Sequence, residues 1–101
     1  MENKTHTVSA LLLNTQRALL GEIESSFRAI TVEWQDHMII VYFYIDGVIS
    51  EELRDKCTSI ATEIVAAYID VGITEKIIRL DYPQEIPIHP HWAYRREEPF
   101  H

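Results

Sequence analysis

The chain has 101 residues, and sixteen acidic side chains against nine basic ones give it a formal net charge of −7. This length corresponds to one domain, large enough for a single core without disulfide or metal staples. The negative charge argues against a nucleic-acid binder, because phosphate contacts need a basic surface. No apolar run approaches the roughly 20 residues that span a bilayer, so we expect neither nucleic acid nor membrane as a partner.

The N-terminal part predicts one amphipathic helix after a polar start. Residues 1–7 are polar, and we expect them to be frayed at the end of a single domain that covers residues 1–101. Residues 8–20 contain strong helix formers without glycine or proline. Ser9 and Thr7 are the candidate N-caps, and Gly21 marks the end. No secretory signal pattern is visible, so we expect a cytoplasmic protein.

Two strands follow as a predicted hairpin. Between Arg28 and Trp34 apolar and polar residues alternate, which indicates a strand with one wet face. Residues 38–45 form a continuous apolar and aromatic run, typical of a strand covered on both faces. Only Gln35-Asp36-His37 separates the two, so we expect them to pair antiparallel.

A long helix comes next. Its apolar face is defined by helical spacing and comprises Leu53, Cys57, Ile60, Ala61, Ile64, Val65 and Tyr68. Ser50 is the predicted N-cap, and Gly72 is predicted to be the left-handed residue that ends the helix. Cys57 is the one cysteine and cannot form an intramolecular disulfide. We interpret it as a small buried hydrophobe, consistent with a reducing compartment.

The C-terminal part predicts two more strands. Residues 76–82 form the third, ended by Pro83, and residues 91–98 alternate as a fourth, edge strand. The expected fold is α+β, with two helices packed on one face of a small, largely antiparallel sheet in the order α-β-β-α-β-β. The other face would carry Tyr42 with Tyr44 or Phe43, and also Trp34.

Side chains capable of chemistry are sparse. His89-Pro90-His91 is the most suggestive cluster, but a metal site needs three or four ligands, so we interpret both histidines as exposed loop residues. No glycine-rich phosphate loop is present, and we expect no cofactor or metal. One alternative is a small enzyme using His89, His91, Arg95 and Arg96. Another is an acidic structural or regulatory subunit of a larger complex.

Four segments carry a resemblance to a known family. They are LNTQRALLG (residues 13–21), DGVISEE (46–52), RLDYP (79–83) and YRREE (94–98). Together they resemble small acidic bacterial immunity proteins of contact-dependent growth inhibition and related polymorphic-toxin systems, over residues 13–98. The resemblance implies a cytoplasmic protein that is not an enzyme and that neutralises one cognate toxin domain, usually a nuclease. It assigns no binding residues.

Binding residues are therefore predicted from chemistry alone. Acidic side chains would complement a basic nuclease site, and aromatic rings on the open sheet face would serve as anchors. The candidate toxin-binding residues are Asp46, Glu51, Glu52, Asp55, Asp81, Glu85, Glu97, Glu98, Tyr42, Tyr44, Trp92 and Tyr94.

Overall fold

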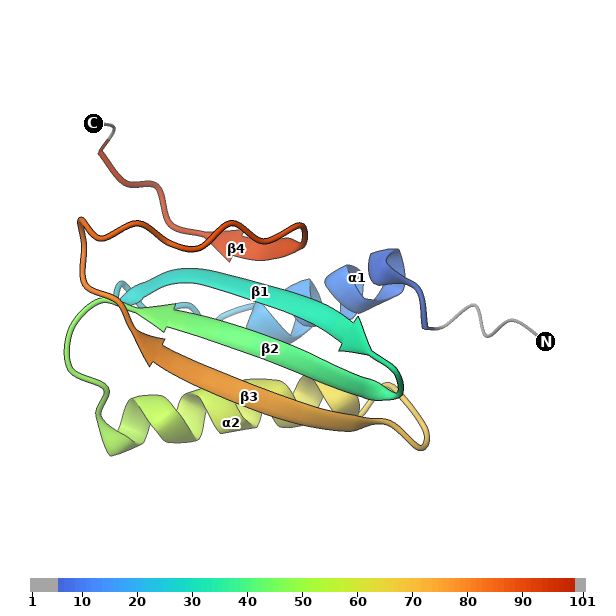
Figure 1. The fold of residues 1–101 in the computed structure, drawn as a ribbon. Helices are drawn as coiled ribbons and strands as arrows, with labels where there is room; N and C mark the ends of the chain where they lie inside the picture. Colours follow the sequence, from blue (N-terminus) through green and yellow to red (C-terminus); the bar gives the residue numbers. More distant parts are fainter. Residues whose placement is uncertain (1–5, 100–101) are drawn as a thin grey trace.

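The computed structural model describes residues 6–99, which form two helices and four strands. In chain order these are α1 (Val8–Leu19), β1 (Phe27–Gln35), β2 (Met38–Ile45), α2 (Glu51–Val65), β3 (Gly72–Arg79) and β4 (Trp92–Arg95). Both helices pack on one face of the sheet (Figure 1). The predicted α+β class is confirmed. The prediction that residues 1–5 are frayed lies outside the described residues.

The sheet is mixed, which corrects the expectation of a largely antiparallel one. Its strand order is β3-β2-β1-β4, and β1 pairs antiparallel with β2 and with β4. β3, however, runs parallel to β2. The reason is that α2 carries the chain back along the sheet, so the Gly72 amide donates to the His37 carbonyl beside the start of β2. β2, α2 and β3 thus form a strand–helix–strand crossover unit, in which the helix and the strands are of similar length.

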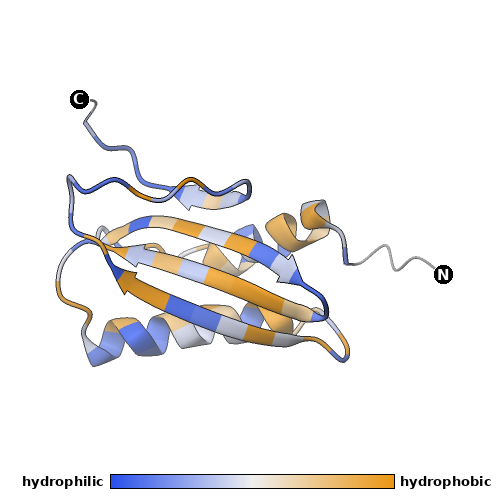
Figure 2. Ribbon diagram, in the orientation of Figure 1, coloured by the Kyte–Doolittle hydropathy of each residue, from blue (hydrophilic) through white to orange (hydrophobic). Residues whose placement is uncertain are grey.

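The core lies between the sheet and the helices. The helix-facing side chains of the two central strands are buried; they are Ile30, Val32, Ile39, Val41, Phe43 and Ile45. From α2 come Leu53, Cys57, Ile60, Ala61 and Ile64, and from α1 Leu11, Ala18 and Leu19. In Figure 2, β2 is mostly hydrophobic, with a few pale bands and no strongly hydrophilic one, in agreement with its central place in the sheet. The predicted inner face of α2 is confirmed for these residues.

Helix caps and the N-terminal contacts refine the prediction. Ser50 caps α2, its hydroxyl accepting from the Leu53 amide at 3.1 Å, as predicted. Thr7, not Ser9, caps α1 by accepting from the Ala10 amide. The fraying of His6 and Thr7 stays a prediction; the His6 ring lies 4.9 Å from that of Trp34. The Trp34 indole also donates to the Thr7 carbonyl.

The third strand begins earlier than predicted. α2 ends at Val65, and the turn that follows has Asp70 at positive φ, so Gly72 is not the helix-ending residue. Gly72 instead opens β3, where a Cβ atom would lie 3.0 Å from the Met38 side chain. The strand ends at Arg79 rather than Tyr82.

The face of the sheet away from the helices is partly covered by residues 80–91, which we call the strap. Tyr42 and Tyr44 lie on this face, as expected, whereas Phe43 and Trp34 pack on the helix side. The strap is held there by His89, whose Nε2 atom is 2.7 Å from the Tyr44 hydroxyl. Tyr44 is consequently only 3% exposed.

Candidate functional site

Acidic candidates from two distant parts of the sequence meet at one end of the molecule. Because β2 and β3 are parallel, Asp46 after β2 and Asp81 after β3 lie side by side. The Gly47 amide donates to Asp81 at 2.8 Å, and the Tyr82 amide donates to Asp46 at 3.2 Å. α2 starts from the same end (Figure 1). We call the surface formed by Asp46, Glu51, Glu52, Asp55 and Asp81 the acidic end.

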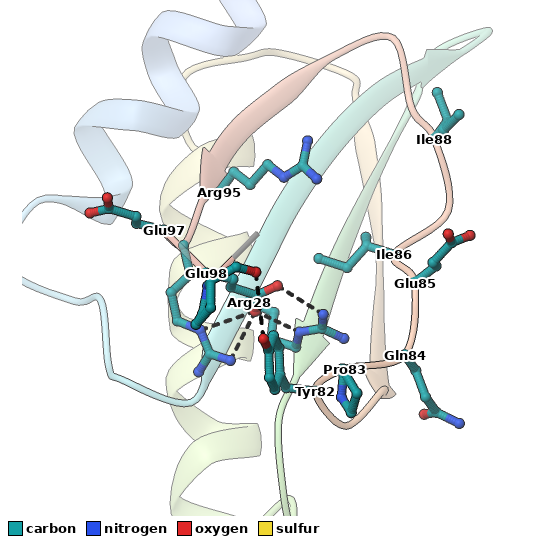
Figure 3. A pocket seen from close by; sticks show the side chains of 12 residues that line it. Arg28, Tyr82, Pro83, Gln84, Glu85, Ile86, Ile88, Arg95, Glu97 and Glu98 are labelled. Atoms are coloured by element: carbon teal, nitrogen blue, oxygen red, sulfur yellow. Dashed lines mark hydrogen bonds and ion pairs between the residues drawn. The ribbon is translucent and has the colours of Figure 1, made fainter. Parts of the chain in front are cut away.

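An ion-pair cluster lies next to the acidic end. The Arg28 guanidinium donates from Nε and Nη2 to both carboxylate oxygens of Glu98, at 2.7 and 2.9 Å, and from Nη1 to the Leu80 carbonyl (Figure 3). Arg96 donates to Glu98 and to Asp46, each at 2.9 Å. The cluster therefore ties the C-terminal segment to β1 and to the end of β2.

The ion pairs change the acid–base chemistry of the carboxylates. The hydrogen bond from Arg28 lowers the pKa of Glu98, and Arg96 adds to the effect although partial burial opposes it. The hydrogen bond from Arg96 likewise lowers the pKa of Asp46. Arg79 lowers the pKa of Asp81. These three candidate residues are ionised and already satisfied within the chain.

Other predicted acids carry charge that no basic side chain of residues 6–99 neutralises. Glu51, Glu52 and Asp55 are exposed on the first turns of α2. Glu85 on the strap and Glu97 beyond β4 are also exposed. Their role in binding stays a prediction, but these five side chains are the ones available to a basic partner.

A groove of about 590 Å³ runs between the strap and the C-terminal segment. Arg28 and Glu98 lie within its lining, and Glu85 and Ile86 border it on the strap (Figure 3). Ile88, another lining residue, is 95% exposed. The groove is thus lined by charges of both signs together with exposed apolar atoms.

The four candidate aromatic residues divide into two groups. Tyr44 is buried beneath the strap, and Tyr94 packs against the core on the helix side. Tyr42 and Trp92 are half-buried on the strap side of the sheet. A cation lies over each ring, with Lys76 Nζ 5.6 Å from the Tyr42 centroid and the Arg95 guanidinium 4.9 Å from that of Trp92. Tyr42 and Trp92 are therefore the two candidate rings that retain contact with solvent on the strap side, whereas Tyr94 is half-buried on the helix side.

The residues of the enzyme alternative are engaged elsewhere. The interpretation of His89 as an exposed loop histidine is wrong, because its ring is half-buried against Tyr42 and Tyr44. His91 is also half-buried. Arg96 belongs to the ion-pair cluster, and Arg95 stacks on Trp92. Among residues 6–99, no three His, Cys, Asp or Glu side chains are grouped so as to hold a metal ion.

Arg28 is the important residue that the sequence analysis missed. It is 2% exposed and lies at an irregularity in β1, between Phe27 and Ala29. The available signal was an arginine flanked by apolar strand residues, since a buried cation requires an acidic partner. That signal could not have indicated which of sixteen acids provides the partner.

Residues 8–98 match the family model described as MafI2 immunity protein. No curated protein matches the chain. Within the described residues, neither helix is long and apolar enough to cross a membrane.

Proposed function

Because the chain belongs to the MafI2 immunity protein family, which comprises immunity proteins of polymorphic toxin systems, we propose that it binds and neutralises one cognate toxin domain. The resemblance noted in the sequence is confirmed at the level of this family. The single observation that carries the proposal is the family match over residues 8–98.

The toxin that suits this chain best is a basic nuclease, met in the cytoplasm as part of a contact-dependent growth inhibition or related system. A nuclease has a basic cleft for its phosphate-bearing substrate, and a chain of net charge −7 complements it. The exposed acids Glu51, Glu52 and Asp55 provide this charge on one rigid helix. Neutralisation by complementary charge on a rigid helix does not require a catalytic group.

Inhibition of this kind requires only that the immunity protein occupies a surface of the toxin domain. The immunity protein must be soluble and stable, and it must place complementary groups against the toxin without reorganising itself. The fully buried helix–sheet core and the ion-pair cluster supply the rigidity. Asp46 and Glu98 contribute to that rigidity rather than to the contact, because their carboxylates are paired internally.

The test is co-purification with the toxin domain encoded by the neighbouring gene, followed by a protection assay. We expect a stable complex and rescue of cells or nucleic acid from the toxin domain when this chain is present. An unrelated acidic protein of similar size and charge is the control, and it should give no rescue. Absence of both binding and protection would contradict the proposed function.

A further inference from the structure

The outer edge of β3 is an unpaired sheet edge. β3 is the terminal strand in the order β3-β2-β1-β4, and its eight residues make an edge about 26 Å long. The opposite edge, β4, has only four residues, and the ion-pair cluster holds the segment that follows it. Long open edges are the surfaces to which another strand can add.

The direction of each backbone group of β3 follows from its pairing. The Gly72 amide donates to the His37 carbonyl just before β2, at 3.1 Å, and the Leu80 amide donates to the Ile45 carbonyl at the end of β2, at 2.8 Å. Since successive amides of a strand point to opposite sides, those of Ile73, Glu75, Ile77 and Arg79 point away from β2. No hydrogen bond from residues 6–99 satisfies these outward groups.

A stripe of α2 borders this edge. The residues Glu51, Asp55, Thr58 and Thr62 follow helical spacing and form one exposed side of the helix. The Thr58 hydroxyl donates to the Glu75 carboxylate on β3, which places the stripe beside the outer edge (Figure 1). A strand added to β3 would therefore lie with half of its side chains over Glu51 and Asp55.

We propose that a basic β-strand of the toxin pairs with the outer edge of β3, donating to and accepting from its outward backbone groups. The proposal rests on the proposed function and names its contact. The negative charge beside the β3 edge determines which partner strand can pair with it. A second copy of this chain would place a second acidic α2 stripe along the same joint, and both copies carry a charge of −7. A toxin strand with Lys or Arg on its helix side has the complementary charge.

Backbone exchange in the wild-type chain tests the pairing directly. The probe is the catalytically inactivated toxin domain encoded beside this chain. In the free protein we expect fast amide exchange at Ile73, Glu75 and Ile77, and slow exchange at Thr74, Lys76 and Ile78. On toxin binding, exchange at the first three should slow by at least about tenfold, the effect of closing new hydrogen bonds.

A pair of substitutions at one position isolates the backbone contribution. Glu75→Pro and Glu75→Ala both remove the carboxylate, but only proline also removes the outward N–H, without touching the ladder to β2. We expect Glu75→Pro to weaken toxin binding about tenfold relative to Glu75→Ala. On α2, Asp55→Lys should weaken binding more than Glu63→Lys, since Glu63 lies on the opposite side of the helix from Thr58.

Three outcomes of these experiments distinguish a failure of the edge pairing from a failure of the proposed function. If the toxin binds while the exchange of Ile73, Glu75 and Ile77 is unchanged, edge pairing is wrong and the proposed function stands. If these amides are protected in the free protein and its mass is doubled, a second copy occupies the edge, which also overturns the inference. If the toxin domain does not bind, the proposed function itself fails.

Discussion

Arg28 shows how one buried charge can organise a segment that would otherwise have little to hold it. Its side chain is 3% exposed, and removing its partner would leave a cation in a nearly dry site. Glu98 meets that need from 70 residues away in the chain. The segment after β4 contributes few core residues, so this ion pair is a main reason for its fixed position.

We predict that Glu98→Ala lowers the free energy of unfolding by about 2–3 kcal/mol. The value is at the low end for a stranded buried charge, because the Glu98 side chain keeps 17% exposure. Glu97→Ala is the matched control, since Glu97 is exposed and unpaired within residues 6–99; it should change stability by less than about 0.5 kcal/mol. Denaturant unfolding measures both. Equal midpoints for the two variants would contradict the role of the pair.

The same pair predicts the pH dependence of stability. The pKa values of Glu98 and Asp46 are lowered in the folded chain, first by hydrogen bonds from Arg28 and Arg96 respectively. Their contribution is therefore complete above the unfolded values of about 4 and is lost as the pH falls through the folded ones. Unfolding midpoints should drop steeply below pH ~4. Glu98→Gln should flatten that drop, and an unchanged slope would count against this assignment.

Histidine 89 acts on the strap in a comparable way without a charge partner. Its Nε2 atom forms a hydrogen bond with the Tyr44 hydroxyl, and its ring lies 4.9 Å from the Tyr42 ring. We predict that His89→Ala costs about 1 kcal/mol of stability, the value of one hydrogen bond with partial loss of ring packing. His91→Ala is the comparison variant, and we expect it to lose less stability than His89→Ala. Thermal unfolding of both variants, and faster amide exchange in the strap of the first, would check this.

Among the elements, α2 connects the fold to the proposed function, since it has three different sides. One side fills the core, with Ile60 and Ile64 no more than 1% exposed. A second carries Lys56, which pairs with Glu24 at 2.9 Å near the end of α1. The third borders the β3 edge through Thr58. Surface changes on the third side should therefore alter binding without altering the fold.

The core side gives a quantitative prediction. Ile60→Ala and Ile64→Ala should each cost 2–5 kcal/mol, the usual loss for a deleted core side chain. This is a large part of the roughly 5–15 kcal/mol that stabilises a domain of this size. Glu63→Ala, on the same helix but exposed, is the control and should cost little. Denaturation midpoints of the three variants suffice, and unchanged values for both isoleucine variants would show that this side is not buried.

Local patterns predicted the elements better than their arrangement. The continuous apolar run identified β2, because this strand is covered on both faces. The helical spacing of apolar residues identified α2, because this helix is covered on one face only. Parallel pairing of β2 and β3 was missed, since strand direction depends on where α2 returns the chain. Gly72 was assigned to a helix end, where glycine is common. A glycine is equally suitable where a strand closely approaches another side chain, as Gly72 approaches Met38, and the sequence does not distinguish the two settings.

The candidate site was predictable in kind and not in detail. Acidity could be read from composition, and the family resemblance from four short segments. Which acids remain free depended on partners distant in the chain, as with Asp46 and Arg96. Likewise, Tyr44 could not be distinguished from Tyr42 until the strap was placed over it.

For the whole molecule, charge is unevenly distributed, and this predicts how association should respond to salt. With a basic toxin domain, the acidic end should speed encounter, towards ~10⁸ M⁻¹s⁻¹ at low salt against ~10⁵–10⁶ without steering. Association should slow steeply as salt shortens the Debye length to about 8 Å, while dissociation changes much less. Stopped-flow or surface-binding kinetics at several salt concentrations measure this.

Charge reversal locates the steering surface. Glu51, Glu52 and Asp55 changed together to lysine should lower the association rate, and reversal of Glu85 and Glu97 tests the groove in parallel. Asp81 and Glu98 are unsuitable for this comparison because they are paired internally. If neither reversal alters binding and association ignores salt, the acidic surface serves solubility alone.

Cys57 gives the molecule a built-in reporter of its own opening. The thiol is fully buried, and desolvation raises its pKa to about 12, so it cannot react while α2 lies on the sheet. A thiol reagent can modify it only in those molecules whose helix has lifted away, where the pKa returns to about 8.5. The labelling rate therefore counts open molecules. A bound toxin lowers that count in proportion to its occupancy, whichever surface it holds.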